Sequence, residues 1–418
     1  MKVCIIGQGY IGVPTATLFA DNGCEVLGVD IHPEIVDKLN EGYLHIEEPG
    51  LEEKLKSAIA KNNYRASTAP EESDVFIITV PTPNNLDDFS CDLTKVKKAC
   101  HDIIPHLKNG NIVIIESTIA PLSTDNEIKL IFEKAGFTIG EDLYLAHCPE
   151  RVLPGNIIKE LINNDRIVGG VTPQCSDKVS QVYGTFVKGK IMKTEAKTAE
   201  MSKCMENTFR DVNIALANEL TKICSKIGIN ALDVIKLANE HPRVNIHSPG
   251  PGVGGHCLAI DPYFIYALAP EEAKLIKLSR DINESMPRFV VNHAKKILKD
   301  IKNPKIAILG VAYKGNTDDM RESPALVVIN LLKNEEYSLT IHDPHIEDEN
   351  YCNFEESIEN ADMALILSDH DEFKNLNFNL IVKKMRNPII FDTKNIVKKN
   401  ENIDNEIKII NFGNMNYF

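Results

Sequence analysis

The stretch PGVGGHCLAIDP, residues 251–262, places a cysteine on a glycine-rich bend. Cys257 follows two glycines and a histidine, and Asp261 lies four positions later. A thiolate acts as a nucleophile when it is exposed and activated, and glycines in a bend give exposure and let a substrate approach closely. The cysteines in apolar runs, which we interpret as structural, are Cys4, Cys24, Cys100 and Cys224. The residues alone leave a structural role for Cys257 as an equally weighted alternative.

The same cysteine belongs to a second pattern, formed by the dipeptides His147-Cys148 and His256-Cys257. Two histidines and two cysteines are a plausible ligand set for zinc. Adjacent residues, however, rarely both reach one ion, and no spaced CxxC pair supports such a site. We therefore predict that the protein holds no metal.

Lys203 and Asn207 lie four residues apart in a segment of helical periodicity, so they share a helix face, which Arg210 extends. A lysine and an amide on one face could stabilise a developing oxyanion. A solvated helix face is the competing interpretation, and spacing alone favours it. The polar loop HCPERVLPG, residues 147–155, carries Glu150 and Arg151 but by itself specifies no reaction.

The hexapeptide GQGYIG, residues 7–12, lies between an apolar run and a helical pattern. In this context it predicts a dinucleotide-binding turn. Gly7 allows the tight turn, Gly9 lets a pyrophosphate approach the backbone, and Gly12 lets the helix pack closely on the strand. The N–H groups near Tyr10 and Ile11, at the start of the helix, would face the anion. A turn that binds no phosphate is the alternative, which the context disfavours.

The next apolar run, EVLGVD, ends in Asp30 at the distance expected of a ribose-binding carboxylate. Asp30 can accept hydrogen bonds from the adenosine ribose hydroxyls, and no arginine follows it to hold a 2′-phosphate. The pattern therefore predicts NAD rather than NADP.

Apolar runs alternate with helical patterns at both ends of the chain, which predicts two doubly wound α/β domains. The second set begins with KIAILG, and its strand SLTIHD ends in Asp343, much as EVLGVD ends in Asp30. Between the two sets, one long helical run ends near Gly228. The fold class we expect is α/β, with Rossmann-like domains at residues 1–193 and 304–418 joined by a long-helix central region at 194–303.

The composition of the chain favours some classes of function over others. The chain of 418 residues has 46 Lys and Arg against 60 Asp and Glu, a formal net charge of −14. This balance argues against nucleic acid but allows a small anionic ligand. We expect no signal peptide and no membrane segment, since no apolar run approaches about 18 residues. The ten scattered cysteines indicate reduced thiols in the cytoplasm.

Taken together, these motifs resemble the UDP-glucose/UDP-N-acetylmannosamine 6-dehydrogenase family over essentially the whole chain. The stretches that carry the resemblance are GQGYIGVP, PTP, ESTIAPLST, HCPERVLPG, the Lys203-to-Asn207 helix, GVGGHCLAIDP and GVAYKGNTDDMRESP. Within the family, HCPERVLPG, ENTFRDVNIALANEL and HPRVNIHSPGPGVGGHC are most similar to the UDP-N-acetyl-D-mannosamine enzymes.

The resemblance implies an NAD-binding domain, a helical dimerisation domain and a C-terminal UDP-binding domain, assembled as a homodimer or a higher homo-oligomer. The implied reaction oxidises the C6 alcohol of a UDP-sugar to a carboxylate, uses two NAD in succession and serves polysaccharide biosynthesis. UDP-N-acetylglucosamine and UDP-glucose remain alternative substrates. A nucleotide-sugar-binding or redox-sensing protein is the non-enzyme alternative, although binding alone needs no nucleophile.

By resemblance, Cys257 is the nucleophile, Lys203 the catalytic lysine and Asn207 a substrate amide. Asp261 is implied to assist proton transfer through water, and Glu150 to act in thioester hydrolysis. The further cofactor contacts implied are Thr82, Thr118 and Arg321. The positions implied near the UDP-sugar are Arg151, Val152, Lys203, Asn207, Arg210, His241, Arg243, Gly254, Tyr313 and Lys314.

Overall fold

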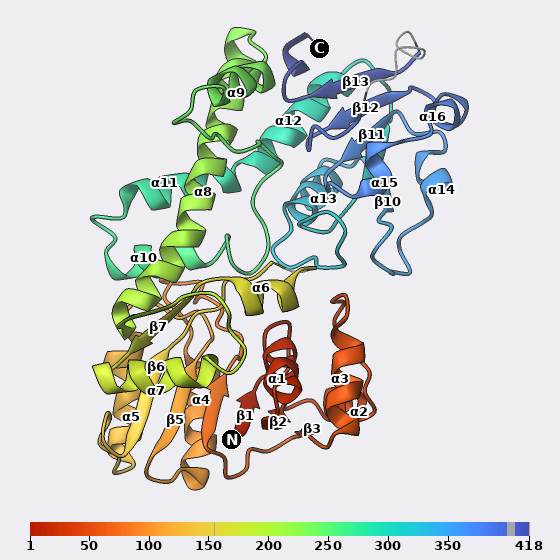
Figure 1. Cartoon of the computed structure of the whole chain (residues 1–418). Helices are drawn as coiled ribbons and strands as arrows, with labels where there is room; N and C mark the ends of the chain where they lie inside the picture. Colours follow the sequence, from red (N-terminus) through yellow and green to blue (C-terminus); the bar gives the residue numbers. More distant parts are fainter. Residues whose placement is uncertain (154, 399–405, 418) are drawn as a thin grey trace. The chain divides into compact units, whose positions relative to one another are not determined.

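The computed structural model describes residues 1–153, 155–398 and 406–417 and is shown in Figure 1. The chain divides into two compact units. The first unit comprises Met1–Glu206 with Tyr263–Pro270, and the second comprises Asn207–Pro262 with Glu271–Phe418. The predicted three-part division at residues 193 and 303 stays a prediction.

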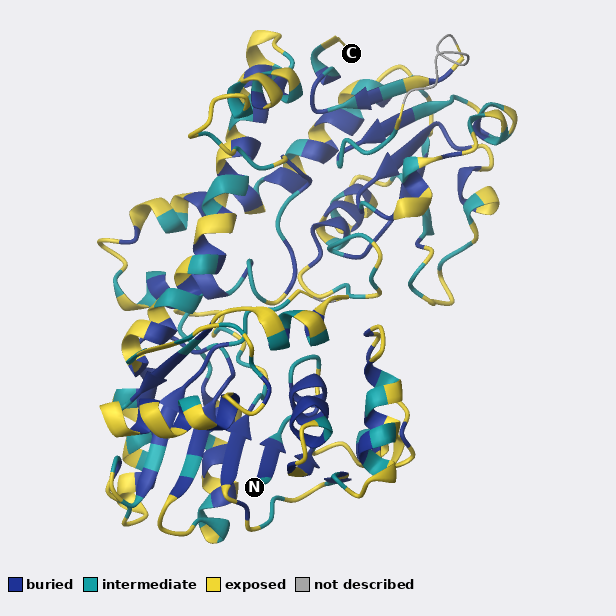
Figure 2. Ribbon diagram, in the orientation of Figure 1, coloured by how far each residue is buried: buried dark blue, intermediate teal, exposed yellow. Residues whose placement is uncertain are grey.

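The first unit contains an eight-stranded sheet of order β3-β2-β1-β4-β5-β6-β7-β8, in which β6 and β7 are antiparallel and the other neighbours parallel. Its strands are β1 (Lys2–Ile6), β2 (Glu25–Val29), β3 (Tyr64–Ser67), β4 (Val75–Ile78), β5 (Asn111–Ile115), β6 (Leu143–His147), β7 (Arg166–Gly170) and β8 (Ile191–Glu195). Four of them, β1, β4, β5 and β6, are nearly continuous apolar runs, as expected for a sheet covered on both faces (Figure 2).

Helices cover both faces of this sheet. On one face α1, α3 and α6 pack against every second residue of the strands, such as Val3 and Ile5. On the other face α4 and α5 pack against the residues between them, such as Cys4. The helices of this unit are α1 (Gly12–Asp21), α2 (Pro33–Asn40), α3 (Leu51–Ala60), α4 (Thr94–Ile103), α5 (Lys129–Lys134), α6 (Ile157–Asn163) and α7 (Pro173–Tyr183).

The second unit contains a parallel sheet of order β10-β9-β11-β12-β13. Helices α12 and α13 cover one face, and α14, α15 and α16 cover the other. Its strands are β9 (Lys305–Leu309), β10 (Ser338–His342), β11 (Met363–Ile366), β12 (Ile389–Asp392) and β13 (Lys408–Asn411). Its helices include α9 (Ala231–Asn239), α11 (Lys274–Glu284), α12 (Met286–Leu298), α13 (Pro324–Asn334), α14 (Phe354–Ile358), α15 (Asp371–Lys374) and α16 (Phe378–Lys384). The predicted pair of doubly wound α/β sheets is confirmed.

One long helix, α8 (Ala196–Ile227), begins directly after β8. It ends where predicted, because Gly228 adopts a φ of +77°, a left-handed conformation that glycine adopts without strain. The helix α10 (Asp261–Leu268) follows the cysteine bend.

All ten cysteines lie in the described part of the chain and are free thiols. Cys4, Cys24, Cys100 and Cys224 are buried, which confirms the structural interpretation, whereas Cys257 is half-buried. In the part of the chain that the structure describes, no helix has both the length and the apolar character needed to cross a membrane.

Candidate active site

The turn after β1 combines three glycines with different requirements. Gly7 has a φ of +96°, which a larger side chain rarely adopts. A Cβ atom at Gly12 would lie 1.8 Å from the carbonyl oxygen of Gly7, so α1 approaches the turn too closely for any side chain. A Cβ atom at Gly9 would meet no protein atom within 4 Å. The chain itself therefore does not need glycine at this position, and the open space above Gly9 fits the approach of a pyrophosphate.

The surroundings of this turn also suit an anion. Helix α1 begins at Gly12 with Ile11 as its N-cap, and its first turn carries no acidic residue, so its positive end is not neutralised locally. The turn lies at the point where the strand order reverses between β1 and β4, the usual ligand site of such sheets. The residues present thus fit a dinucleotide.

Asp30 lies directly after β2, where its carboxylate serves the turn itself. Its Oδ2 accepts a hydrogen bond of 2.9 Å from Gln8 N, and its Oδ1 accepts one of 3.0 Å from His32 N. Asp30, which we predict binds the ribose, is therefore also a structural hydrogen-bond acceptor. Lone pairs on both of its carboxylate oxygens remain for further donors.

Thr82 and Thr118, both implied by resemblance to contact the cofactor, lie together. They follow β4 and β5, which are neighbours in the sheet, and Thr82 Oγ1 donates to the carbonyl oxygen of Thr118 at 2.5 Å. Beside them Thr79 Oγ1 donates to the carbonyl oxygen of Gly7 at 2.6 Å, so these loops and the glycine turn share one edge of the sheet.

The loop HCPERVLPG begins at the carboxyl end of β6 and is fixed at both ends. Glu150 Oε2 accepts from Arg166 Nη2 at 2.5 Å, and Glu150 Oε1 accepts from Arg151 N at 2.7 Å. At the far end Glu48, 7% exposed, accepts from the backbone N–H groups of Gly155 and Ile157. Leu153 N donates to Glu160, on α6. The described residues on both sides of residue 154 are thus held by buried or partly buried carboxylates.

Glu150 belongs to a buried cluster that sequence reasoning missed. Arg166, at the start of β7, donates both to Glu150 and to Glu116, which follows β5, and its guanidinium lies 4.0 Å from the ring centroid of Tyr183. The hydroxyl of Tyr183 donates to Glu116 Oε1 at 3.0 Å. A charged residue that opens or closes an otherwise apolar strand was the available signal, since a buried charge requires a partner.

The other implied residues of this unit connect the loop to α8. The Arg151 side chain pairs with Glu206, the Arg151 Nε lying 2.9 Å from a carboxylate oxygen, and donates to the carbonyl oxygen of Asp165 at 3.0 Å. Val152 packs at the edge of the first core. Lys203 lies on α8 three residues before Glu206 and contributes to lowering the pKa of the buried His147, after burial itself, to about 3.

In the second unit Asn207 connects two of the implied residues. Its Nδ2 donates to Asp261 Oδ2 at 2.5 Å, and its Oδ1 accepts from Arg210 Nη2. Asn207 and Asp261 are 1% and 3% exposed, so this amide–carboxylate pair is buried. The pair places the start of α10, four residues after Cys257, against α8.

The bend that carries Cys257 packs against the loop after β9. A Cβ atom at Gly254 would lie 2.8 Å from Cβ of Tyr313, and one at Gly252 would lie 2.9 Å from Cβ of Pro324. The backbone N–H of Gly255 donates to the carbonyl oxygen of Arg321 at 2.9 Å. We expected these glycines to provide exposure and substrate access. The structure gives another reason, because this close packing leaves no room for side chains.

A buried polar chain fixes both ends of the same bend. Gly250 N donates to Asn218, whose amide donates to Asn283, whose amide in turn donates to Asp211. Arg280 pairs with the same Asp211 at 2.7 Å and reaches the carbonyl oxygen of Leu258 at 3.5 Å. These residues of α8 and α11 were also not predicted.

The remaining implied residues lie in loops of the second unit. His241 and Arg243 are exposed after α9, and Arg243 N donates to His241 Nδ1 at 3.3 Å. Lys314 follows Tyr313 in the loop after β9. Arg321 lies in the same loop and pairs with Asp319 through two nitrogens, at 2.9 and 2.6 Å.

The zinc alternative fits the structure poorly at Cys148. This thiol is fully buried, donates to the carbonyl oxygen of Ile167 and accepts from Arg166 Nε. Burial raises the pKa of the Cys148 thiol to about 12, whereas a zinc ligand must be a thiolate.

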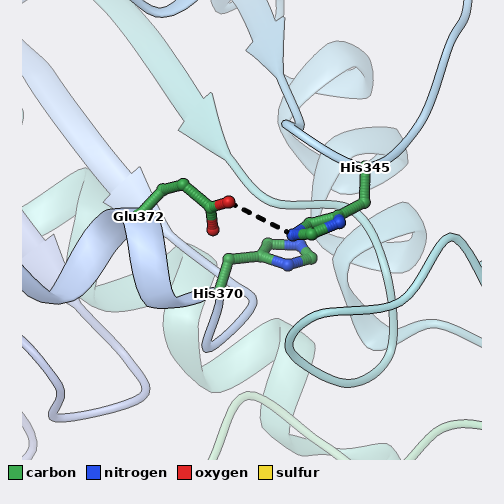
Figure 3. A group of neighbouring side chains, drawn as sticks. All are labelled: His345, His370 and Glu372. Carbon is green, nitrogen blue, oxygen red and sulfur yellow. Dashed lines mark ion pairs between the residues drawn. The ribbon is translucent and has the colours of Figure 1, made fainter. Parts of the chain in front are cut away.

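Within residues 1–153, 155–398 and 406–417, one group has the spacing of metal ligands, His345, His370 and Glu372, with ligand atoms within 4.8 Å of one another (Figure 3). His370 Nδ1 accepts from Asn316 N at 2.9 Å, and its Nε2 lies 3.1 Å from Asp343 Oδ2. A neutral imidazole that accepts at one nitrogen must donate at the other, so His370 has no lone pair left for a metal. The group does not fit a metal site.

Three family models match consecutive parts of the chain: the NAD binding domain of the UDP-glucose/GDP-mannose dehydrogenase family at residues 1–187, its central domain at 197–285 and its UDP binding domain at 307–399. The chain belongs to the UDP-glucose/GDP-mannose dehydrogenase family.

Individual relatives match over nearly their full length. A UDP-N-acetyl-D-mannosamine dehydrogenase of Methanocaldococcus jannaschii is 50% identical, over 95% of this chain and 93% of the relative. One of Methanococcus maripaludis is 48% identical, over 96% of this chain and 94% of the relative. Among solved structures, the UDP-N-acetyl-mannosamine dehydrogenase Cap5O from S. aureus matches with a TM-score of 0.94 and 53% identity over 100% of both chains.

The glycine turn yields the first prediction. We expect Gly12→Ala to lower the free energy of unfolding by about 3 kcal/mol, because the new methyl group would overlap the backbone of Gly7. Gly9→Ala should leave stability unchanged but weaken NAD binding more than about tenfold, or about 1.4 kcal/mol. Thermal denaturation and calorimetric titration with NAD measure the two effects separately. Undiminished NAD affinity in Gly9→Ala would show that the pyrophosphate does not approach this turn.

Proposed function

We propose that this enzyme oxidises the C6 alcohol of UDP-N-acetyl-D-mannosamine to the carboxylate of UDP-N-acetyl-D-mannosaminuronate. The observation that carries the proposal is the similarity, at 48–53% identity over nearly the whole chain, to proteins named as dehydrogenases of this sugar nucleotide. The fit of the glycine turn to a dinucleotide and the half-buried Cys257 support the same activity.

NAD is the proposed cofactor, held by the glycine turn, Asp30, Thr82, Thr118 and Arg321. It supplies the hydride acceptor in both oxidation steps, so one sugar consumes two NAD. The carboxylate of Asp30 would repel the 2′-phosphate of NADP, which favours NAD. The free thiols suit a reducing cytoplasm, and the uronate product suits polysaccharide biosynthesis.

The first step removes a proton from the C6 hydroxyl and a hydride from C6, which gives an aldehyde. Cys257 then adds through its sulfur to C6, and the carbonyl oxygen takes up a proton, giving a thiohemiacetal. Loss of a second hydride from C6 and of the hydroxyl proton gives a thioester. Water adds to the thioester carbonyl, the C–S bond breaks, and the carboxylate leaves with regeneration of the thiol. Over the cycle two hydrides leave C6 and one water is consumed.

The proposed roles of the surrounding residues follow from their chemistry. Lys203 and Asn207 stabilise the developing oxyanion, and Asp261, held by the Asn207 amide, assists proton transfer through water. Glu150 takes the proton of the water that hydrolyses the thioester. Arg151, Val152, Arg210, His241, Gly254, Tyr313 and Lys314 are the proposed contacts of the UDP-sugar.

We further propose a homodimer built on α8. Phe209, Leu216 and Ile223 repeat every seven residues on this helix, and with Ile227 they are 50–61% exposed, so the chain itself leaves this apolar stripe uncovered. A second copy of the same helix presents a matching stripe, which closes the surface with twofold symmetry. Arg243 is then expected to act in the site of the neighbouring subunit.

The substrate proposal is tested by a panel of sugar nucleotides. Purified protein is mixed with NAD and UDP-N-acetylmannosamine, UDP-N-acetylglucosamine or UDP-glucose, and NADH absorbance is followed. We expect kcat/KM to be highest for UDP-N-acetylmannosamine, with two NADH formed per sugar. A higher value for another sugar would reassign the substrate, and absence of NADH with every sugar would favour a nucleotide-sugar-binding or redox-sensing protein.

The thioester mechanism makes Cys257 necessary for the second oxidation only, because a thiolate cannot displace hydride from an alcohol carbon. Cys257→Ala should abolish formation of the acid while leaving UDP-sugar binding nearly intact. It should still reduce a supplied UDP-sugar 6-aldehyde with NADH. Cys148→Ala, the matched control, should keep two NADH per sugar. Acid formation by Cys257→Ala near the original rate would refute the mechanism.

The dimer proposal predicts that charges on the stripe separate the subunits. We expect the double variant Leu216→Glu and Ile223→Glu to sediment as a monomer, because each lost contact removes about 1.5–3 kcal/mol of apolar burial and leaves a charge at the interface. Lys193→Glu, an exposed change outside α8, should remain dimeric. A fully active monomer of the unaltered protein at assay concentration would contradict the proposal.

A further inference from the structure

In the buried cluster around Arg166, Glu150 has a proposed role in the reaction, whereas Glu116 and Arg166 have none so far. Glu116, Glu150 and Arg166 have side chains 0%, 9% and 5% exposed. They come from separate elements: Glu116 follows β5, Glu150 follows β6, and Arg166 begins β7. Because β5, β6 and β7 are consecutive in the sheet, the three side chains meet at their ends. The cluster therefore contains Glu150, which is proposed to act in catalysis, together with two residues that have no assigned role.

The charges of this cluster do not cancel. One guanidinium faces two carboxylates, so a net negative charge would remain in a buried environment if both were ionised. The other groups that face Glu116 add no positive charge: they are Tyr183 from α7, Cys148 after β6 and Thr15 from α1, whose hydroxyl lies 3.5 Å from Glu116 Oε2. Burial raises the pKa of Glu116 to about 7, opposed by the nearby Arg166 and reinforced by Glu150.

The hydrogen bonds of Arg166 connect the carboxylates of Glu116 and Glu150. Arg166 donates to both carboxylates through Nη2, which carries two N–H groups, so one cation pairs with two carboxylates. The remaining contacts of Arg166, to the sulfur of Cys148 and to the ring of Tyr183, hold the guanidinium in place. When Glu116 is neutral, Arg166 pairs with a single carboxylate anion, that of Glu150. When Glu116 is ionised, the same cation is shared by two anions, and a second negative charge lies near Glu150.

We propose that Glu116, acting through Arg166, is a positioning residue that sets the basicity of Glu150 in thioester hydrolysis. The inference rests on the proposed function. In this step water adds to the acyl carbon, Glu150 takes up one proton of that water, and the C–S bond breaks with the electron pair going to the sulfur of Cys257. The hydride transfers do not use Glu150, so they are independent of Glu116.

Glu116→Gln tests this role because glutamine keeps the shape and one acceptor oxygen but can never carry the charge. At steady state with NAD and the sugar nucleotide, samples are quenched in acid, and the fraction of Cys257 that carries the acyl group is measured by mass spectrometry. We expect this fraction to rise about tenfold or more in the variant, within the range contributed by a general base. A burst of two NADH per active site should precede slow turnover.

The pH dependence provides a second readout that a merely structural role would not change. In the unaltered enzyme the acyl fraction should fall as pH rises through about 7, because Glu116 then ionises and Glu150 becomes the stronger base. In Glu116→Gln it should stay high and nearly constant over the same range. Tyr183→Phe, which removes the donor to Glu116 but keeps the ring, should shift the transition of the unaltered enzyme to higher pH.

Asp177→Asn is the matched control, since Asp177 forms an exposed pair with Lys193 in the same unit and should leave every readout unchanged. Equal loss of the first NADH and of turnover in Glu116→Gln, without an acyl adduct, would overturn the proposal, and so would an unchanged acyl fraction. If the unaltered protein forms no NADH with any sugar nucleotide, the proposed function fails instead.

Discussion

Both units depend on a hydrogen bond between a carboxylate and the backbone of the turn that follows the first strand of each sheet, β1 or β9. In the first unit Asp30 Oδ2 accepts from Gln8 N at 2.9 Å, and in the second Asp343 Oδ2 accepts from Val311 N at 2.7 Å. Each turn also contains a glycine of positive φ, Gly7 at +96° and Gly310 at +87°. The N–H groups of Gln8 and Val311 follow the last donors to the neighbouring strand, so a carboxylate at the end of that strand satisfies them. It thereby fixes the edge where the proposed ligand residues lie.

This repeated device explains why the layout of the chain was predictable. The apolar strand, the glycine after it and the aspartate that ends the next strand are all local features. They recur in the same order in KVCIIG with EVLGVD and in KIAILG with SLTIHD. The meeting of Thr82 with Thr118 follows from the same rule, because parallel neighbouring strands bring their carboxyl ends together. The pattern does not reveal the structural role of Asp30, because its hydrogen bond from Gln8 N depends on the turn geometry.

The cluster around Arg166 could not be predicted as a cluster, because no sequence spacing relates residues 116, 150 and 166. Only the order β5-β6-β7 in the sheet makes them neighbours. Glu116 and Arg166 nevertheless left a signal, a charge at the end of an apolar strand, where an unpaired charge would be strongly destabilising. Sequence analysis can thus indicate that Arg166 needs a carboxylate, but it cannot identify which one.

The bend that carries Cys257 shows how one residue pattern can have two physical causes. The two glycines before His256 suggested exposure and close approach of a substrate. Glycines 252, 254 and 255 are also needed because Pro324 and Tyr313 occupy the space of their side chains. The chain Gly250–Asn218–Asn283–Asp211 adds buried hydrogen bonds at one end of the bend. In the proposed mechanism, Cys257 on such a bend is positioned before the aldehyde forms. Little conformational entropy is then lost when its sulfur adds to C6, so this ordering favours the proposed step.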